Sequence, residues 1–115
     1  MIIKPPYQLI SQSETAFSLE CDFRGDYPYF AGHFPSFALL AGVVQLGLVH
    51  QFVQQFFALS LSQATIRQIK YQQPILPESK VLLSVQYYPE QKRLDFKWQQ
   101  AEKVMSSGIF ILKSE

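Results

Sequence analysis

The residues best suited to chemistry lie in one stretch, where a loop containing a histidine comes directly before a long apolar segment. The loop is Gly-His-Phe-Pro at 32–35, and the apolar segment begins at Leu40. Its glycine gives the backbone freedom and its proline fixes φ, so the loop can hold the imidazole of His33 rigidly in apolar surroundings. A helix that begins here offers unpaired N–H groups around 41–43, and these can bind a carbonyl oxygen that gains negative charge.

An imidazole base beside such a helix start suits removal of the proton α to a thioester carbonyl. The alternative is that His33 only makes a hydrogen bond within a turn. These residues by themselves leave both interpretations open.

The stretch resembles the signature of the hotdog-fold 3-hydroxyacyl-acyl-carrier-protein dehydratases of the FabZ/FabA type. That signature is a GHFP loop, a PxxPGV step, an acidic residue on the helix and a Gln one turn later. The sequence GVVQL after HFP is most similar to the small ApeI-like dehydratases of aryl polyene clusters. The resemblance implies a hydro-lyase in fatty acid or aryl polyene/polyketide biosynthesis. It implies a substrate bound to an acyl carrier protein, and no metal or organic cofactor.

The resemblance also implies a role for each matching residue. His33 would be the general base. The backbone N–H groups of Gly42 and Val43 would polarise the thioester carbonyl. The remaining pocket residues that match or neighbour the motif are Phe34, Pro35, Gly47, His50 and Gln51.

The main departure from the family pattern is a missing acid, because the position of the family's Glu or Asp is Gly47. Dehydration needs a proton donor for the departing hydroxyl, and such help is typically worth about 10²–10⁴-fold. His50, one helical turn later, is one possible substitute; otherwise it packs or faces solvent. Asp22 or Asp26 could also approach, although a solvated or turn-forming role is more usual for such residues.

Another chain is the third source of an acid. In the family that the sequence resembles, the dimer puts the His of one subunit opposite the acidic residue of the other. A heterodimer with an intact FabZ/ApeI-like paralogue would have one complete site, formed by His33 and the partner's acid, whereas a homodimer would have none. The competing interpretations are a non-catalytic acyl-binding or partner-stabilising subunit, and a hotdog thioesterase.

The elements that must position these residues are indicated by hydrophobic periodicity. The apolar segment predicts one long helix over about 41–59, with apolar residues nearly all the way round, which indicates an enclosed helix. Alternation of apolar and polar residues predicts strands over 15–23, 66–72, 80–88, 93–99 and 103–112. We therefore expect one α+β domain over 1–115, with the helix wrapped by an antiparallel sheet of five or six strands, as in a hotdog fold.

Gly47 is unusual inside such a helix. Glycine costs a helix about 1 kcal/mol relative to alanine, so we expect a close approach of another part of the chain to compensate. Dimerisation is expected to pair two sheets edge to edge and so to cover an exposed strand edge.

Composition limits the classes of function. The chain has 115 residues, of which 48% are hydrophobic, and a formal net charge of +1. These values fit one folded domain better than a disordered tail, and the small net charge argues against nucleic acid as a partner. One cysteine, Cys21, excludes an internal disulfide and a multi-cysteine zinc site. Pro5 and Pro6 interrupt any signal peptide, and Gln and His residues interrupt the apolar segment, so we expect a soluble cytoplasmic protein without membrane contact.

Other residues carry less weight. Solvated charge and contact with an acidic carrier protein are both open for four basic residues, Arg67, Lys70, Lys80 and Lys97. Core packing and the lining of an acyl or aryl tunnel are both open for four aromatic residues, Tyr29, Phe30, Phe34 and Phe37. Cys21 lies on the apolar side of its strand, so we expect a buried small hydrophobe and not a nucleophile.

Overall fold

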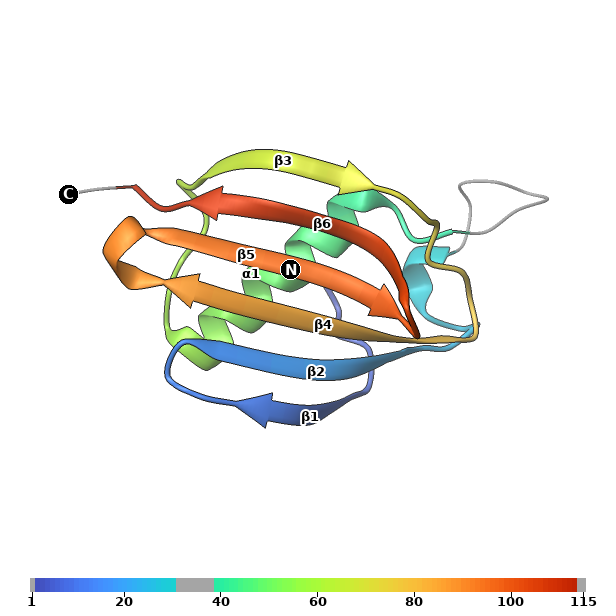
Figure 1. Ribbon diagram of the computed structural model, residues 1–115. Coiled ribbons are helices and arrows are strands. Elements are labelled where there is room, and N and C mark those ends of the chain that lie inside the picture. Colours follow the sequence, from blue (N-terminus) through green and yellow to red (C-terminus); the bar gives the residue numbers. More distant parts are fainter. Residues whose placement is uncertain (1, 31–38, 114–115) are drawn as a thin grey trace.

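The computed structural model describes residues 2–30 and 39–113, in which one long helix packs against a sheet of six strands (Figure 1). The strands are β1 (Tyr7–Gln12), β2 (Ala16–Phe23), β3 (Thr65–Tyr71), β4 (Ser79–Tyr88), β5 (Arg93–Gln100) and β6 (Lys103–Ile111). The helix is α1 (Gly42–Phe57), and two short 3₁₀ turns are η1 (Pro28–Phe30) and η2 (Pro89–Gln91). The strand order is β1-β2-β4-β5-β6-β3, and each neighbouring pair is antiparallel.

This architecture confirms the expected α+β fold. All five predicted strands are present, and the ends of each differ from the prediction by at most one residue. The strand that the pattern did not predict is β1, whose six residues are all exposed, so its apolar side chains show no alternation. It forms because its backbone pairs with β2, across a register shift between Leu9 and Ser11.

The core lies between α1 and the inner face of the sheet. Alternate residues of the central strands point toward the helix and are almost fully buried: Phe17, Leu19, Cys21 and Phe23 on β2, Val81, Leu83 and Val85 on β4, and Leu94, Phe96 and Trp98 on β5. The helix contributes Leu48, Val49, Phe52 and Val53, each 0% exposed. Burying one large apolar side chain contributes about 1.5–3 kcal/mol, so this layer holds the helix in place.

The helix is fully buried only on the side that faces the sheet, and the expectation of an enclosed helix is wrong for the described residues. Val43 in the first turn is 74% exposed. Gln54 and Gln55 in the last turn are also exposed. The apolar residues that gave the all-round pattern include Leu46, which is only half-buried. Packing against a single sheet therefore leaves part of the helix available for other contacts.

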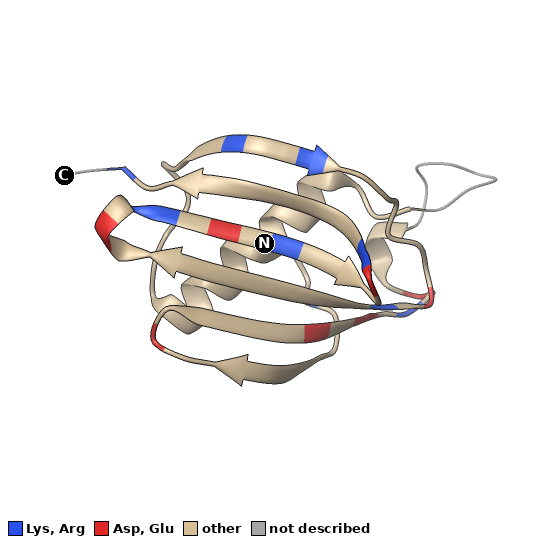
Figure 2. Ribbon diagram, viewed as in Figure 1, with Lys and Arg blue, Asp and Glu red and all other residues tan. Residues whose placement is uncertain are grey.

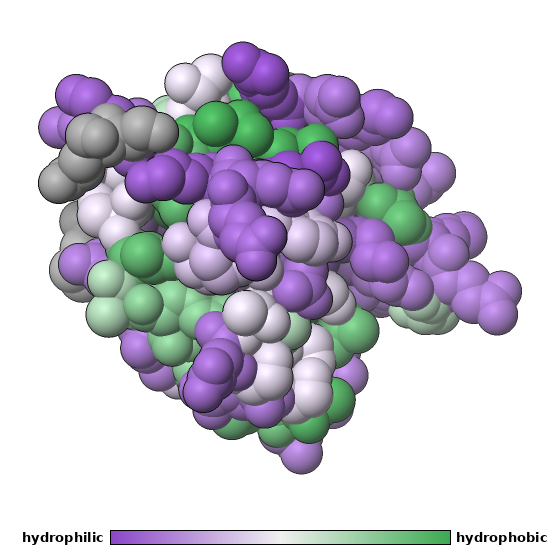
Figure 3. Space-filling model, turned by 60° about the vertical axis from the view of Figure 1, so that its left-hand side comes forward, coloured by the Kyte–Doolittle hydropathy of each residue, from purple (hydrophilic) through white to green (hydrophobic). Residues whose placement is uncertain are grey.

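Two strands form the edges of the sheet, β1 at one side and β3 at the other (Figure 1). Each edge carries exposed apolar side chains, Leu9 and Ile10 on β1 and Ile66 and Tyr71 on β3. Figure 3 shows apolar residues reaching the surface between hydrophilic side chains. None of the helices in the described residues is long and apolar enough to cross a membrane.

Candidate functional site

The predicted site residues divide into two groups. The Gly-His-Phe-Pro loop, with His33, Phe34 and Pro35, lies outside the described residues, so the roles given to those residues stay predictions. The other predicted site residues all lie on α1, and the structure describes them: Gly42, Val43, Gly47, His50 and Gln51.

The helix begins where the sequence predicts a carbonyl-binding turn. Ala41 precedes the first turn in an extended conformation, with φ −62° and ψ 145°, and its side chain provides no capping hydrogen bond. The N–H groups of Val44 and Gln45 both donate to the carbonyl oxygen of Ala41, at 3.1 and 3.2 Å. Within the described residues no backbone hydrogen bond uses the N–H of Gly42 or Val43. These two donors lie at the positive end of the helix dipole, where an oxygen that gains negative charge is stabilised.

Tyr71, at the end of edge strand β3, packs over this helix start. A Cβ atom at position 42 would lie 2.5 Å from Cζ and 2.6 Å from the hydroxyl oxygen of Tyr71, so a larger residue there would require the Tyr71 ring to move. Partial burial raises the pKa of the Tyr71 phenol, whose hydroxyl is a hydrogen-bond donor at neutral pH. The sequence analysis missed Tyr71, because neither a motif nor a periodicity connects it to Gly42.

A cavity of about 300 Å³ opens at the same place. Its lining combines the helix start with the segment after β3: Leu39, Leu40, Gly42, Gln45, Tyr71, Gln72, Gln73 and Pro74. Gly42, whose N–H has no partner among the described residues, therefore borders a hollow that opens to the surface.

Two buried polar side chains fix the segment that leads into the helix. The hydroxyl of Ser106 on β6 donates to Oε1 of Gln45 at 2.6 Å, and Nε2 of Gln45 donates to the carbonyl oxygen of Leu40 at 3.1 Å. Leu40 in turn donates its N–H to the carbonyl of Ile75 at 2.8 Å. Gln45 is 3% and Ser106 0% exposed, so both hydrogen bonds are shielded from water. They tie the uncapped helix start to the sheet.

The close approach expected at Gly47, where glycine lowers helix stability, is present in the structure. A Cβ atom at this position would overlap the side chain of Ile2, whose Cδ1 lies directly against the glycine. An isoleucine side chain therefore occupies the place where the family's acid would begin.

The alternative sources of an acid lie as follows. Asp22 on β2 forms a 3.3 Å ion pair with the exposed Arg24, and Asp26 is exposed in the following turn. The side chain of His50 is half-buried and makes no hydrogen bond to another described residue. Gln51 lines a small hollow of about 190 Å³ with Lys4, Gln54 and Gln55. Among the described residues, no hydrogen bond joins the side chain of Asp22, Asp26, His50 or Gln51 to the first turn of α1.

The predictions for Cys21 and for the aromatic residue Phe30 concern the core. Cys21 is fully buried, and burial raises the pKa of its thiol well above the usual range, so it is a small core residue as expected. Phe30 is 5% exposed and packs against Tyr27 and Phe23, with ring centroids 6.0 and 6.5 Å apart, which is core packing. Phe34 and Phe37 lie outside the described residues.

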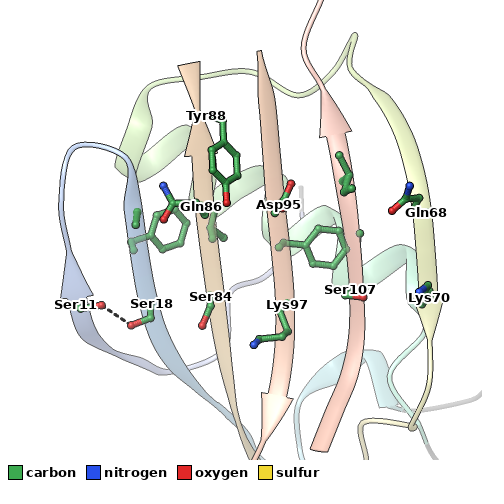
Figure 4. A pocket seen from close by; sticks show the side chains of 16 residues that line it. Ser11, Ser18, Gln68, Lys70, Ser84, Gln86, Tyr88, Asp95, Lys97 and Ser107 are labelled. Atoms are coloured by element: carbon green, nitrogen blue, oxygen red, sulfur yellow. Dashed lines mark hydrogen bonds between the residues drawn. The ribbon is translucent and has the colours of Figure 1, made fainter. Parts of the chain in front are cut away.

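The basic residues lie on a different surface. Lys70 and Lys97 line a hollow of about 600 Å³ on the sheet face opposite the helix, together with Asp95 and serines of four strands (Figure 4). Basic and acidic residues alternate along β5, whereas β3 carries only basic ones (Figure 2). Lys80 lies opposite Asp22 in the β2–β4 register, and Arg67 is exposed. This mixture of charges is that of a solvated sheet face, so the hollow adds nothing to the helix-start site.

Comparison of the coordinates with solved structures shows a hotdog fold. The structure of the dehydratase heterocomplex ApeI:P from Xenorhabdus doucetiae matches with a TM-score of 0.85 and 23% identity, over 97% of this chain and 100% of that one. An uncharacterised protein from Erwinia carotovora subsp. atroseptica matches with a TM-score of 0.75 and 28% identity, over 98% and 96%. Thioesterase superfamily member 2 from Mus musculus matches at 0.65 with 13% identity, over 90% and 78%.

The family is established by sequence. The model of the ApeI-like family, described as ApeI dehydratase, matches residues 9–109. The chain therefore belongs to the ApeI-like dehydratase family. No curated protein has significant similarity to it.

Proposed function

We propose that this protein is a cytoplasmic dehydratase subunit that acts on 3-hydroxyacyl chains bound to an acyl carrier protein, and that a partner hotdog chain completes its site. One observation carries the proposal. The N–H groups of Gly42 and Val43, which we assign to carbonyl binding, have no backbone partner among the described residues, whereas the side chain of Ile2 lies against Gly47, the position of the family's acid.

The chemistry divides between the two chains. His33 removes a proton from C2 of the 3-hydroxyacyl thioester, and the N–H groups of Gly42 and Val43 stabilise the negative charge on the carbonyl oxygen. The C2–C3 double bond forms as the C3–O bond breaks. An acidic residue of the partner protonates the departing hydroxyl, which leaves as water. No metal or organic cofactor takes part.

The surface beside the helix start supports a partner of this kind. Val43 on α1 and Ile66 and Tyr71 on edge strand β3 are exposed apolar residues, and the outer backbone groups of β3 lie at the edge of the sheet. Pairing of this edge with a second sheet would cover apolar area and satisfy the edge strand. A related hotdog protein, ApeI:P from Xenorhabdus doucetiae, is described as a heterocomplex.

The test is a dehydration assay of the chain alone, of the paralogous hotdog chain expressed with it, and of their mixture. With the paralogue's own histidine replaced, so that only the shared site can act, we expect the mixture to exceed the sum of the separate rates by about 10²-fold or more, the value of a general acid. His33→Ala in the mixture should remove this gain, while Gln54→Ala, a change at an exposed position of α1, should retain it. A mixture that gains nothing would contradict a shared site.

A non-catalytic, partner-stabilising subunit is the second candidate, because Gly47 and Ile2 leave this chain without an acid. In that case the mixture is more active than the paralogue alone, but His33→Ala leaves the rate unchanged. No observation on this chain favours the thioesterase interpretation, because the similarity to the mouse thioesterase is limited to the fold.

A further inference from the structure

The N-terminal segment Ile2–Pro6, called the strap below, crosses α1 on the side that carries Gly47 and Gln55. The side chain of Ile2 lies against Gly47. Lys4, two residues further along the strap, makes the next contacts. The ammonium of Lys4 donates to Oε1 of Gln55 at 2.6 Å and lies 5.3 Å from the centre of the Phe52 ring. The strap therefore contacts three successive turns of the helix.

Hydrogen bonds to the rest of the chain hold the strap in this position. The hydroxyl of Tyr27 donates to the carbonyl of Ile3 at 2.6 Å, and the N–H of Ile3 donates to the hydroxyl of Tyr29 at 2.9 Å. At its other end the carbonyl of Pro6 accepts the N–H of Asp22 at 2.8 Å. The two tyrosines flank and belong to η1, the turn directly before the predicted histidine loop.

We propose that the strap closes the acid position of this chain, with the Ile2 side chain occupying the space that the family's Glu or Asp takes. This inference rests on the proposed function. A methyl group can neither donate a proton to a leaving hydroxyl nor hold a water molecule that would. Where a partner's histidine faces Gly47, the strap makes that half-site inert, and the pair works with one site.

The same packing explains why position 47 is glycine. Alanine is the better helix residue, and at an open helix position it would stabilise the protein. Here any Cβ atom must first displace Ile2, and Ile2 is joined through Ile3 to the two tyrosines. In Gly47→Ala, the helix stability that alanine adds is therefore opposed by the stability that is lost when Ile2 is displaced.

The experiment is a double-mutant cycle read by thermal unfolding of the full chain. Gly47→Ala is made in the natural chain and in an Ile2→Ala background. We expect Gly47→Ala to raise Tm by about 4 °C in the Ile2→Ala background, the shift that the helix propensity of alanine implies for a domain of this size. In the natural chain the shift should be at least about 3 °C smaller, or negative.

Ile3→Ala is the matched control, because Ile3 is the next residue of the strap but its side chain is 59% exposed. Gly47→Ala should shift Tm equally in the Ile3→Ala background and in the natural chain. The proposal is overturned if Gly47→Ala gives the same shift in the Ile2→Ala background and in the natural chain, within about 2 °C. The cycle needs no substrate, so its outcome is independent of the dehydration assay that tests the proposed function.

Discussion

The buried bond between Ser106 and Gln45 gives the sharpest prediction for the helix start. Ser106→Ala removes the donor of a 2.6 Å hydrogen bond and leaves Oε1 of Gln45 unpaired, in a side chain that is 3% exposed. An unsatisfied buried acceptor costs about 1–3 kcal/mol. For a domain of this size about 1 kcal/mol corresponds to about 4 °C, so we expect Tm to fall by about 4–12 °C.

Ser79→Ala is the matched control for that change. Ser79 is also buried, at 7% exposure, but its hydroxyl forms no hydrogen bond with the described residues. Its replacement should change the free energy of unfolding by no more than about 0.5 kcal/mol. Equal losses for Ser106→Ala and Ser79→Ala would refute the idea that the bond to Gln45 carries the stability.

Activity separates a positioning role from a purely structural one. Gln45→Met keeps the side-chain length but releases the carbonyl of Leu40, so the first turn of α1 loses its tie to β6. In the active mixture, assayed well below Tm, we expect kcat to fall roughly tenfold with KM little changed, as misplacement of a stabilising group predicts. Ser106→Ala added to Gln45→Met should cost less than it does alone, because the bond is already lost. Unchanged kcat in folded Gln45→Met would contradict the positioning role.

Three further predictions concern single positions. Gly42→Ala should lower Tm because its Cβ would lie 2.5 Å from the Tyr71 ring, and Tyr71→Ala in the same chain should recover most of the loss; no recovery would contradict that contact. The Cys21 thiol should resist thiol reagents in the folded protein. Because burial raises its pKa, the free energy of unfolding should decrease as pH rises above about 8.5, where the unfolded thiol ionises, and Cys21→Ala should remove this component of the slope. Gly47→Glu should give the chain alone measurable dehydration, and more when combined with Ile2→Ala; a folded but inert double variant would favour the non-catalytic subunit.

Local patterns were sufficient for most of the fold. The alternation in β2, β4 and β5 predicts which side of each strand is buried, because neighbouring side chains of a strand point to opposite faces. The same argument fails for β1, where all six residues are exposed and the strand exists through its pairing with β2. It also overstates the burial of α1, since an apolar residue such as Val43 adds to the pattern whether or not anything covers it.

The site was predictable only where its residues are neighbours in the chain. Gly42 and Val43 begin the helix because the apolar run begins there, and the cost of glycine at position 47 correctly implied a close contact. The identity of that contact, Ile2, has no local signal, because the two residues are far apart in the sequence. The same is true of Ser106, which is 61 residues from Gln45.

These long-range contacts have a common consequence for the division of labour between subunits. Tyr71 covers Gly42, Ser106 binds Gln45, and Ile2 fills the space at Gly47, so three separate parts of the chain hold the first turns of α1. The N–H groups of Gly42 and Val43 are therefore positioned by contacts within one chain. In the function that we propose, the proton donor is the one group of those turns that a second chain would have to supply.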